Sequence, residues 1–358
     1  MKKTIAILLS ICLSVIAFAG CSLPNPDDKG EGTPSNSSPT VQAGTTASNP
    51  TDPAPSESGD TPTDSNDPTE PTDHAHAYGE DQLCEICGWA YPENLYYFRF
   101  VGSGDGYYIL ASYYGDEENV IIPQKYNGKP IQGIGDRAFE DRSNLLSIEI
   151  PDSVTSLGYR AFGGCTSLVS VTVPGTMVSI YTTAFENCTG LKSVVFEDGV
   201  RSMDGFMGCT ALESVTVPDS VTSIGSNAFQ NCSSLSSIHI PDGVTLVGAK
   251  AFDGCSKLIE TENGISYVEN WAILCDQAVT DAVLRDGTVG IATATFYECT
   301  SLKSITIPVS MKTIPMYAVR SCPSLTTVNY CGTEAQWDEI SISSYNDELL
   351  AANVVYHS

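Results

Sequence analysis

Four side chains near the first quarter of the chain are suited to metal chemistry. His74, His76, Cys84 and Cys87 lie in the stretch HAHAYGEDQLCEICGWA, which contains one C-x-x-C motif. Two thiolates and one or two imidazoles can complete a tetrahedral zinc site. No second C-x-x-C motif occurs in the sequence, so a small disulfide-closed turn, or a linker fragment without a ligand, stays open as an alternative. The segment predicts at most one zinc ion, and the sequence indicates no other cofactor.

Nothing else in the sequence indicates catalysis. The chain contains no G-x-S-x-G, H-E-x-x-H, phosphate-binding loop or EF-hand motif. Its other histidines are His239, at an outward strand position, and His357 near the end. The acidic residues are scattered, and no pattern holds two carboxylates across a cleft. We therefore predict a protein that is not an enzyme.

A second group of cysteines follows a period. Seven recur through the C-terminal two thirds of the chain: Cys165, Cys188, Cys209, Cys232, Cys255, Cys299 and Cys322. Like-phased side chains in stacked turns lie about 4.8 Å apart, whereas a disulfide needs Cβ atoms near 3.8 Å with a defined dihedral angle. We therefore expect these seven thiols to be buried and free. Arg142 takes their place in the first turn, and Cys275 lies one residue off the expected phase.

The elements that position these cysteines repeat about every 23 residues. Each unit has a phenylalanine, a cysteine three residues later, a leucine three residues further on, and then an alternating strand such as SIEIP or SITIP. Inward Ile and Val side chains and the stacked Phe and Leu columns predict a solenoid with one short strand per turn. The segment GISYVENWAILCD departs from the unit, and we interpret it as a small hairpin excursion.

The unit LxSIxIPxxVxxIGxxAFxxC resembles the leucine-rich repeats of the BspA-like type. The resemblance implies an α/β-type but mostly β, right-handed, curved solenoid with roles in attachment or protein binding. We place the repeats at residues 133–330, an N-terminal cap with a hairpin around GSGDG at 91–132, and a C-terminal cap at 331–358. Trp337 and Ile340 are the predicted plugs of the last turn.

The N-terminal part predicts export and anchoring. Lys2 and Lys3 precede a short apolar run and the stretch AFAGC, which resembles the lipobox of bacterial lipoproteins. We expect a signal peptide at 1–20 and a lipid on the Cys21 sulfur; an ordinary secretory signal is the alternative. Residues 21–73 are rich in Pro, Ser, Thr and Asp, which predicts a disordered linker ahead of the His/Cys segment at 74–90. The protein would then lie on the extracellular face of the membrane.

The outward strand positions form the candidate binding face. It comprises Glu149, Thr172, Val195, Thr216, His239 and Thr306. We expect it to run continuously over the turns and to bind a protein on a host or neighbouring cell. The formal net charge of -26 argues against a nucleic-acid partner. A carbohydrate-handling or metal-binding surface module, and a purely structural envelope protein, are the alternatives.

Overall fold

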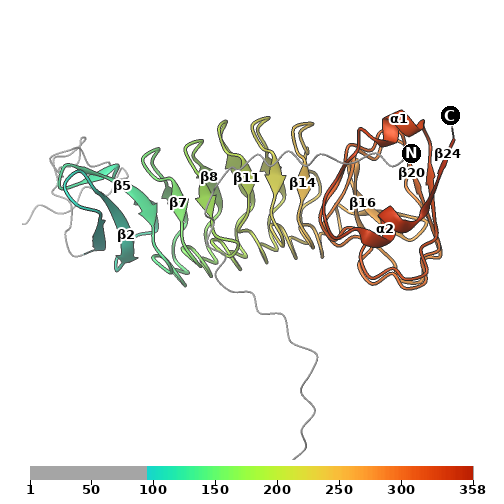
Figure 1. Ribbon diagram of the computed structural model, residues 1–358. Helices are drawn as coiled ribbons and strands as arrows, with labels where there is room; N and C mark the ends of the chain where they lie inside the picture. The colour runs from blue at the N-terminus through green and yellow to red at the C-terminus, as the bar shows by residue number, and fades with distance from the viewer. Residues whose placement is uncertain (1–94, 358) are drawn as a thin grey trace, which may run out of the picture. The chain divides into compact units, whose positions relative to one another are not determined.

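The computed structural model describes residues 95–357. They form a mostly β solenoid whose turns stack one after another from β2 to β24 (Figure 1). They lie in one compact unit, Pro68–Ser358. The predicted signal peptide, Cys21, the linker and the His/Cys segment are outside the described residues.

The strand that follows each leucine forms the first row of the solenoid. Its outward and inward side chains alternate, as in Ser170–Val173, where Val171 and Val173 are buried. Neighbouring turns pair in parallel and in register, so that Thr172 lies opposite Val195, and Val195 opposite Thr216. These strands are β3 (Asn119–Ile121), β6 (Ser147–Glu149), β8 (Ser170–Val173), β10 (Ser193–Phe196), β12 (Ser214–Thr216), β18 (Asp281–Val283), β20 (Ser304–Ile307), β22 (Thr327–Tyr330) and β24 (Asn353–Tyr356).

The expectation of one strand per turn was wrong, because a second row of parallel strands runs along the solenoid. Most are two residues long, with an inward Ile, Leu, Met or Val that is buried in most turns, as in Ser223–Ile224. Two residues are too few to show the alternation by which strands are recognised in a sequence. These strands are β5 (Lys129–Ile134), β7 (Ser156–Leu157), β9 (Ser179–Ile180), β11 (Ser202–Met203), β13 (Ser223–Ile224), β14 (Leu246–Val247), β19 (Gly290–Ile291), β21 (Thr313–Ile314) and β23 (Ser341–Ile342).

A loop after the second row carries the phenylalanine column. The rings of Phe139, Phe162 and Phe185 are fully buried and stack with centroids 5.0 and 4.9 Å apart. This agrees with the predicted stacking at the spacing of parallel strands. Residues with positive φ flank most of the column phenylalanines; Asn227 and Asn231, at 60° and 62°, flank Phe229.

The excursion is an antiparallel meander, which confirms the predicted hairpin. It consists of β15 (Glu260–Glu262), β16 (Ile265–Val268) and β17 (Trp271–Cys275). Asn263 and Gly264 join β15 to β16 with φ of 51° and 80°, as a two-residue hairpin turn requires. The meander separates β12 from β18, so the first row is two sheets rather than one. The hydrophobic core likewise divides here into two clusters.

Cys275 combines features of two positions of the regular turn. Its N–H donates to the carbonyl of Thr295 at 3.0 Å, the same bond that Phe229 makes to Ala251 at 2.8 Å. Its thiol is hydrogen-bonded with the Cys299 thiol, as the Cys165 thiol is with that of Cys188. Cys275 is therefore the neighbour of Cys299 in the cysteine row, although the meander changes the number of residues in this turn.

Both ends of the solenoid are closed. At the N-terminal end the hairpin predicted around GSGDG is present, with β1 (Tyr96–Val101) antiparallel to β2 (Tyr107–Tyr113). β4 (Lys125–Tyr126) pairs with β5, and the rings of Phe98 and Tyr126 stack at 4.3 Å.

The C-terminal end carries two short helices, α1 (Glu334–Trp337) and α2 (Asp347–Ala351). Trp337 and Ile340 are buried, as predicted for plugs, and the Trp337 ring lies 5.3 Å from that of Tyr330.

Candidate binding face and the core behind it

The structure places Glu149, Thr172, Val195, Thr216 and Thr306 on strands of the first row. His239 lies in a turn that has a single bridge, between Ser214 and Ser237, in place of the predicted strand. Glu149, Thr172, Val195, Thr216 and His239 are exposed, and Thr306 is half-buried. Val195 has 39% of its surface exposed although it is aliphatic, because its strand neighbours Val194 and Phe196 face the core.

Hydroxyl groups on the same surface join neighbouring turns. Ser147 Oγ donates to Asn119 Oδ1, and Ser304 Oγ donates to Asp281 Oδ1, each at 2.6 Å. The hydrogen bonds from Ser304 and Thr280 lower the pKa of the Asp281 carboxyl group. The first strand row therefore exposes a polar, hydrogen-bonded surface.

The expectation of one continuous face was wrong. One sheet comprises β3, β6, β8, β10 and β12, and the other comprises β18, β20, β22 and β24. At the end of the first sheet, Glu269 of the meander accepts a hydrogen bond from the N–H of Ile240 at 2.7 Å and lies 3.5 Å from His239 Nδ1. The face is thus two separate surfaces, with His239 at the edge of the first.

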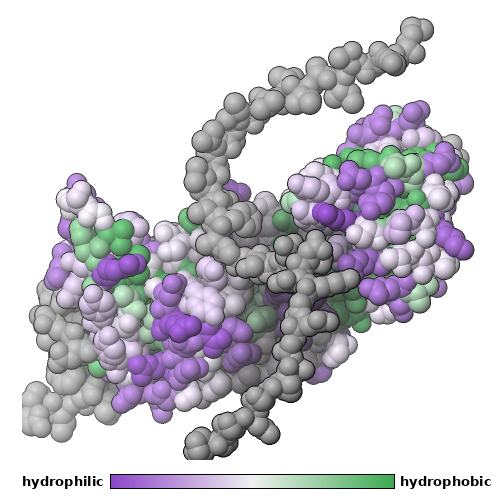
Figure 2. Space-filling view, turned by 60° about the horizontal axis from the view of Figure 1, so that its bottom comes forward, coloured by the Kyte–Doolittle hydropathy of each residue, from purple (hydrophilic) through white to green (hydrophobic). Residues whose placement is uncertain are grey.

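Exposed hydrophobic side chains are spread over the described surface rather than gathered on the face. Figure 2 shows one side of the molecule, where hydrophobic areas are interspersed with hydrophilic ones. The most exposed aliphatic side chains are Val178, Leu350, Leu274 and Val309, at 81, 60, 54 and 53%. They belong to different turns of the solenoid.

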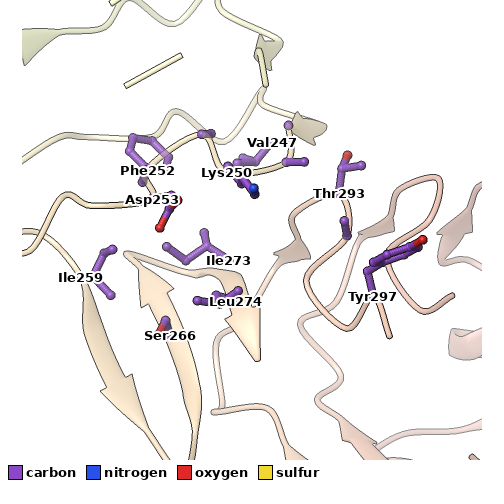
Figure 3. Close-up of a pocket in the computed structure, with 14 residues that line it drawn as sticks. Val247, Lys250, Phe252, Asp253, Ile259, Ser266, Ile273, Leu274, Thr293 and Tyr297 are labelled. Carbon is purple, nitrogen blue, oxygen red and sulfur yellow. The ribbon is translucent and has the colours of Figure 1, made fainter. Parts of the chain in front are cut away.

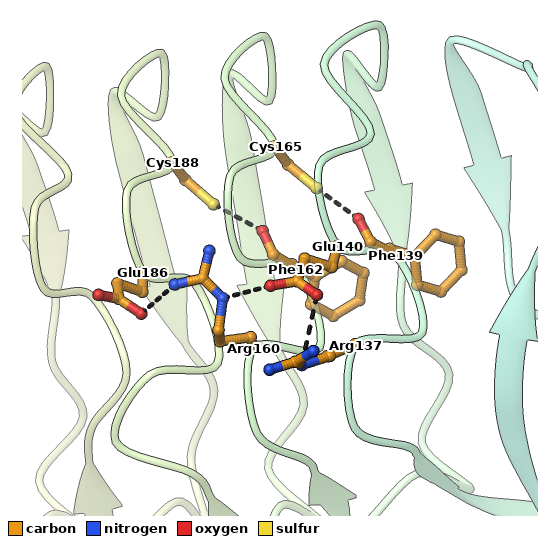
Figure 4. A network of polar contacts seen from close by, with 8 residues as sticks. All are labelled: Arg137, Phe139, Glu140, Arg160, Phe162, Cys165, Glu186 and Cys188. Carbon is orange, nitrogen blue, oxygen red and sulfur yellow. Dashed lines mark hydrogen bonds and ion pairs between the residues drawn. The ribbon is translucent and has the colours of Figure 1, made fainter. Parts of the chain in front are cut away.

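The cysteines form a ladder of thiol hydrogen bonds behind the face. All seven predicted thiols are buried and free, which confirms the prediction. In six of the seven, the Sγ atom donates a hydrogen bond to the backbone carbonyl of the phenylalanine in the preceding turn (Figure 4). The donor–acceptor pairs are Cys165–Phe139, Cys188–Phe162, Cys209–Phe185, Cys232–Phe206, Cys255–Phe229 and Cys322–Phe296, at 2.9–3.3 Å.

The first turn uses an arginine for the same bond. Arg142 stands at the cysteine position, and its Nη2 donates to the carbonyl of Tyr113 at 2.5 Å. Tyr113 in turn holds the phenylalanine position, with its ring 4.8 Å from that of Phe139. A donor at this position therefore recurs in every regular turn.

The surroundings of the thiols keep them unreactive. Hydrogen bonding with Cys188 and burial raise the pKa of the Cys165 thiol well above its ordinary range. Burial raises the pKa of Cys322 to about 12. Hydrogen bonding with Cys232 lowers the pKa of Cys255, and hydrogen bonding with Cys275 lowers that of Cys299. All seven thiols are buried, so lack of access for a reagent, rather than thiolate content, is what the seven share. Cys331 is exposed and lies outside the ladder.

Sequence reasoning missed a ladder of ion pairs on the loops. Arg160 bridges Glu140 of the preceding turn and Glu186 of the following one, and Arg137 lies 3.4 Å from Glu140 (Figure 4). These side chains occur two residues before, or one residue after, a column phenylalanine. Alignment of the repeats by phenylalanine would therefore have brought the opposite charges together.

The described residues offer no metal site and no membrane span. Within 95–357 no three His, Cys, Asp or Glu side chains are grouped to hold an ion. In the same range no helix combines the length and apolarity needed to cross a bilayer. The predicted zinc ligands His74, His76, Cys84 and Cys87 are outside this range.

Several solved structures are similar to the chain. A leucine-rich cell-surface protein from Faecalibacterium prausnitzii is 24% identical, with a TM-score of 0.37, over 70% of this chain and 98% of that one. The Treponema pallidum leucine-rich repeat protein is 21% identical, with a TM-score of 0.33, over 67 and 84%. A leucine-rich repeat protein from Bacteroides ovatus is 20% identical, with a TM-score of 0.35, over 73 and 77%. No curated protein matches the chain.

The family follows from the repeats themselves. Their model, the BspA type leucine-rich repeat region, matches in six copies over residues 132–259 and 222–348. Together these matches span more than half of the 358 residues and include the phenylalanine column and the cysteine ladder. The chain belongs to the BspA-type leucine-rich repeat family.

Proposed function

We propose that the chain is a cell-surface lipoprotein that binds a protein on a host or neighbouring cell. A lipid on Cys21 would hold it on the extracellular face of the membrane, and the linker at 21–73 would carry the solenoid away from the bilayer. The family supports a binding or adhesive role rather than an enzymatic one.

One observation carries the choice of surface. Thr172, Val195 and Thr216 lie side by side in register on three adjacent strands, exposed to solvent. Their backbone is held by the parallel pairing of the strands and by the buried side chains of Val171, Val194 and Val215 beneath them. A rigid, polar surface suits a reversible protein interface, because little side-chain or loop ordering is needed on binding. Val195 supplies an apolar contact at its centre.

Adhesion of cells that display the full chain tests this proposal. Val195→Lys combined with Thr216→Glu should abolish adhesion, since both charges would have to be desolvated in the interface. Val178→Lys is the matched control, because Val178 is also an exposed valine but lies outside the first strand row. Melting should show that each exposed substitution changes stability by no more than ~0.5 kcal/mol. Equal adhesion of the face variant and the control would exclude this surface.

The anchor is tested separately. Cys21→Ala removes the acceptor thiol, so metabolic labelling with a fatty-acid analogue should label the parent and not the variant. Equal labelling of the two would show that Cys21 carries no lipid.

A further inference from the structure

A cavity of about 220 Å³ lies where the meander interrupts the solenoid. The loop after β14 forms one wall, the strands β16 and β17 form the floor, and the loop after β19 forms the other wall (Figure 3). Its lining includes Phe252, Ile259, Ile273, Leu274, Thr293 and Tyr297. The lining is mostly apolar, and a dry apolar cavity of about 150 Å³ is large enough to take up benzene.

The cavity exists because one loop is missing from the stack. The meander returns to the second row through β17, which pairs with β19. It has no counterpart of the loop that carries the phenylalanine in a regular turn, so none of the described residues fills the space between the loops of Phe252 and Phe296. The N–H of Thr293 donates directly to the carbonyl of Val247, two turns earlier, at 2.9 Å. Beyond this bond the two loops diverge around the cavity.

The missing loop leaves two backbone donors without acceptors. In each regular turn the phenylalanine N–H and the N–H two residues later donate to carbonyls of the next loop. Phe229 and Asn231 do so to Ala251 and Asp253, at 2.8 and 2.7 Å. The corresponding donors of the next turn are Phe252 and Gly254, and within residues 95–357 neither N–H has an acceptor. Phe252 is buried, so its N–H is the one for which the missing acceptor is costly, whereas Gly254 is exposed.

The C-terminal cap shows what the fold uses to satisfy such donors. Val319 and Ser321 hold the same two positions in the last turn, where no further loop follows. Asn346 Oδ1 accepts from the N–H of Val319, and Glu348 Oε1 accepts from that of Ser321, both at 2.9 Å. Leu349, which follows directly, is fully buried. The cap thus places a carboxamide, a carboxylate and an aliphatic side chain where the next loop would have been.

We propose that the cavity binds a peptide segment of another protein that has the same arrangement: Asn or Asp, then Glu two residues later, then a large aliphatic residue. The two acidic or amide side chains accept hydrogen bonds from the N–H groups of Phe252 and Gly254. The aliphatic residue fills the cavity against Ile273 and Leu274. This site would give the proposed function a second, specific contact. It rests on the proposed function only in the assumption that the ligand is a protein.

The charges at the rim are consistent with this ligand. Lys250 lines the cavity and lies two residues before Phe252 in the same loop. Its positive charge attracts a carboxylate of the peptide. Asp253 also lines the cavity, and its carboxylate accepts a hydrogen bond from the Gln230 amide at 3.0 Å. Recognition therefore depends on the paired N–H donors and the apolar cavity more than on net charge.

A synthetic peptide with the sequence of residues 344–351, SYNDELLA, is the probe. Labelled with a fluorophore and titrated with the full chain, it should give a saturable anisotropy change. The control peptide SYADALLA lacks both acceptor side chains and should bind at least tenfold more weakly. Equal binding of the two peptides, or no binding of either up to millimolar protein, would overturn the proposal.

Two further measurements locate the site. Leu274→Asp should weaken binding of SYNDELLA at least tenfold, whereas Val309→Asp should leave it unchanged, because Val309 is equally exposed but lies outside the cavity. In the unsubstituted chain, the peptide should slow amide hydrogen exchange in residues 250–255.

The site would be overturned if Leu274→Asp and Val309→Asp bound SYNDELLA with equal affinity. It would also be overturned if the peptide slowed amide hydrogen exchange only in segments outside residues 250–255. The exchange measurement needs no variant, so it remains decisive if Leu274→Asp fails to fold. Adhesion through the sheet face is a different assay, and its proposal stands or falls independently of this one.

Discussion

The Sγ atom of Cys165 donates a hydrogen bond to the carbonyl oxygen of Phe139, in the preceding turn, at 3.1 Å. Both residues are fully buried, so this carbonyl has no access to water. The N–H of Arg142 also donates to this carbonyl, at 3.3 Å, so the thiol is its second donor. In six turns a cysteine makes this bond while filling little volume. Asn has the larger side chain, and Ala has no donor, which gives a physical reason for cysteine at this position.

The first prediction concerns that bond. Cys232→Ala removes the Sγ donor to the Phe206 carbonyl, which then keeps only the bond from the N–H of Cys209 at 3.3 Å. We expect the free energy of unfolding to fall by about 0.5–1.5 kcal/mol, the net contribution of one hydrogen bond. Urea denaturation measures the change. Cys331→Ala is the matched control, because Cys331 is exposed and lies outside the ladder, and should have no measurable effect. Equal stability of the two variants would remove the ladder as a stabilising element.

Thiol chemistry gives a second prediction. A thiol reagent at pH 8 should modify Cys331 quickly, because it is exposed, and the seven ladder thiols only after denaturant is added. Burial denies the reagent access to the seven thiols, and hydrogen bonding with Cys188 together with burial also holds the pKa of Cys165 well above its ordinary range. Mass spectrometry without reductant should find the seven unpaired. Disulfides among them would contradict the ladder.

The junction with the meander gives a third prediction. A Cβ atom at Gly290 would lie 2.5 Å from the buried ring of Trp271, its partner across β17 and β19. Gly290→Ala should therefore displace the ring and lower the free energy of unfolding by about 1–3 kcal/mol. Gly243→Ala is the control, since its Cβ would meet no atom closer than 3.5 Å. Equal denaturation midpoints would show that the junction tolerates the extra carbon.

The regular turns could be predicted from the sequence because their determinants are local and repeated. A buried Phe162 or Leu168 recurs at a fixed interval, and each copy strengthens the same interpretation. Trp337 was recognisable as a plug because a large apolar residue follows the last repeat.

The features that escaped prediction depend on how different turns lie against one another. The position of Cys275 depends on the path of the meander. The Arg160 ion pairs join three turns, and the second strand row is stabilised by pairing between turns rather than by its own pattern. The discontinuity of the binding face has the same origin, because the length of the meander, not the composition of its strands, separates β12 from β18.

The last prediction concerns Asp204, which lies two residues before Phe206, where the interval between column phenylalanines shortens from 23 residues to 21. Its side chain is half-buried, and its Oδ1 atom is inaccessible and has no hydrogen-bond partner, while Ser202 donates to Oδ2 at 3.1 Å. Burial raises the pKa of this carboxyl group from its ordinary value of 3.8 to about 6. The folded chain therefore binds the proton more tightly than the unfolded chain does.

The sign of the pH dependence follows from that difference. Well below pH 3.8 Asp204 is neutral in both states, so it costs no stability. Between pH 3.8 and about 6 the unfolded chain ionises and the folded chain does not, so stability falls over this range and the loss is complete once the folded group is ionised too. Asp204→Asn should therefore match the parent near pH 3 and be more stable at pH 7–8, by at most about 3 kcal/mol for a shift of roughly 2 units. Urea denaturation over this pH range measures the difference. Asp198→Asn is the control, because it removes the same charge from an exposed residue and should leave the parent's pH dependence unchanged. If Asp204→Asn is no more stable than Asp198→Asn at pH 8, the carboxyl group of Asp204 is solvated rather than buried.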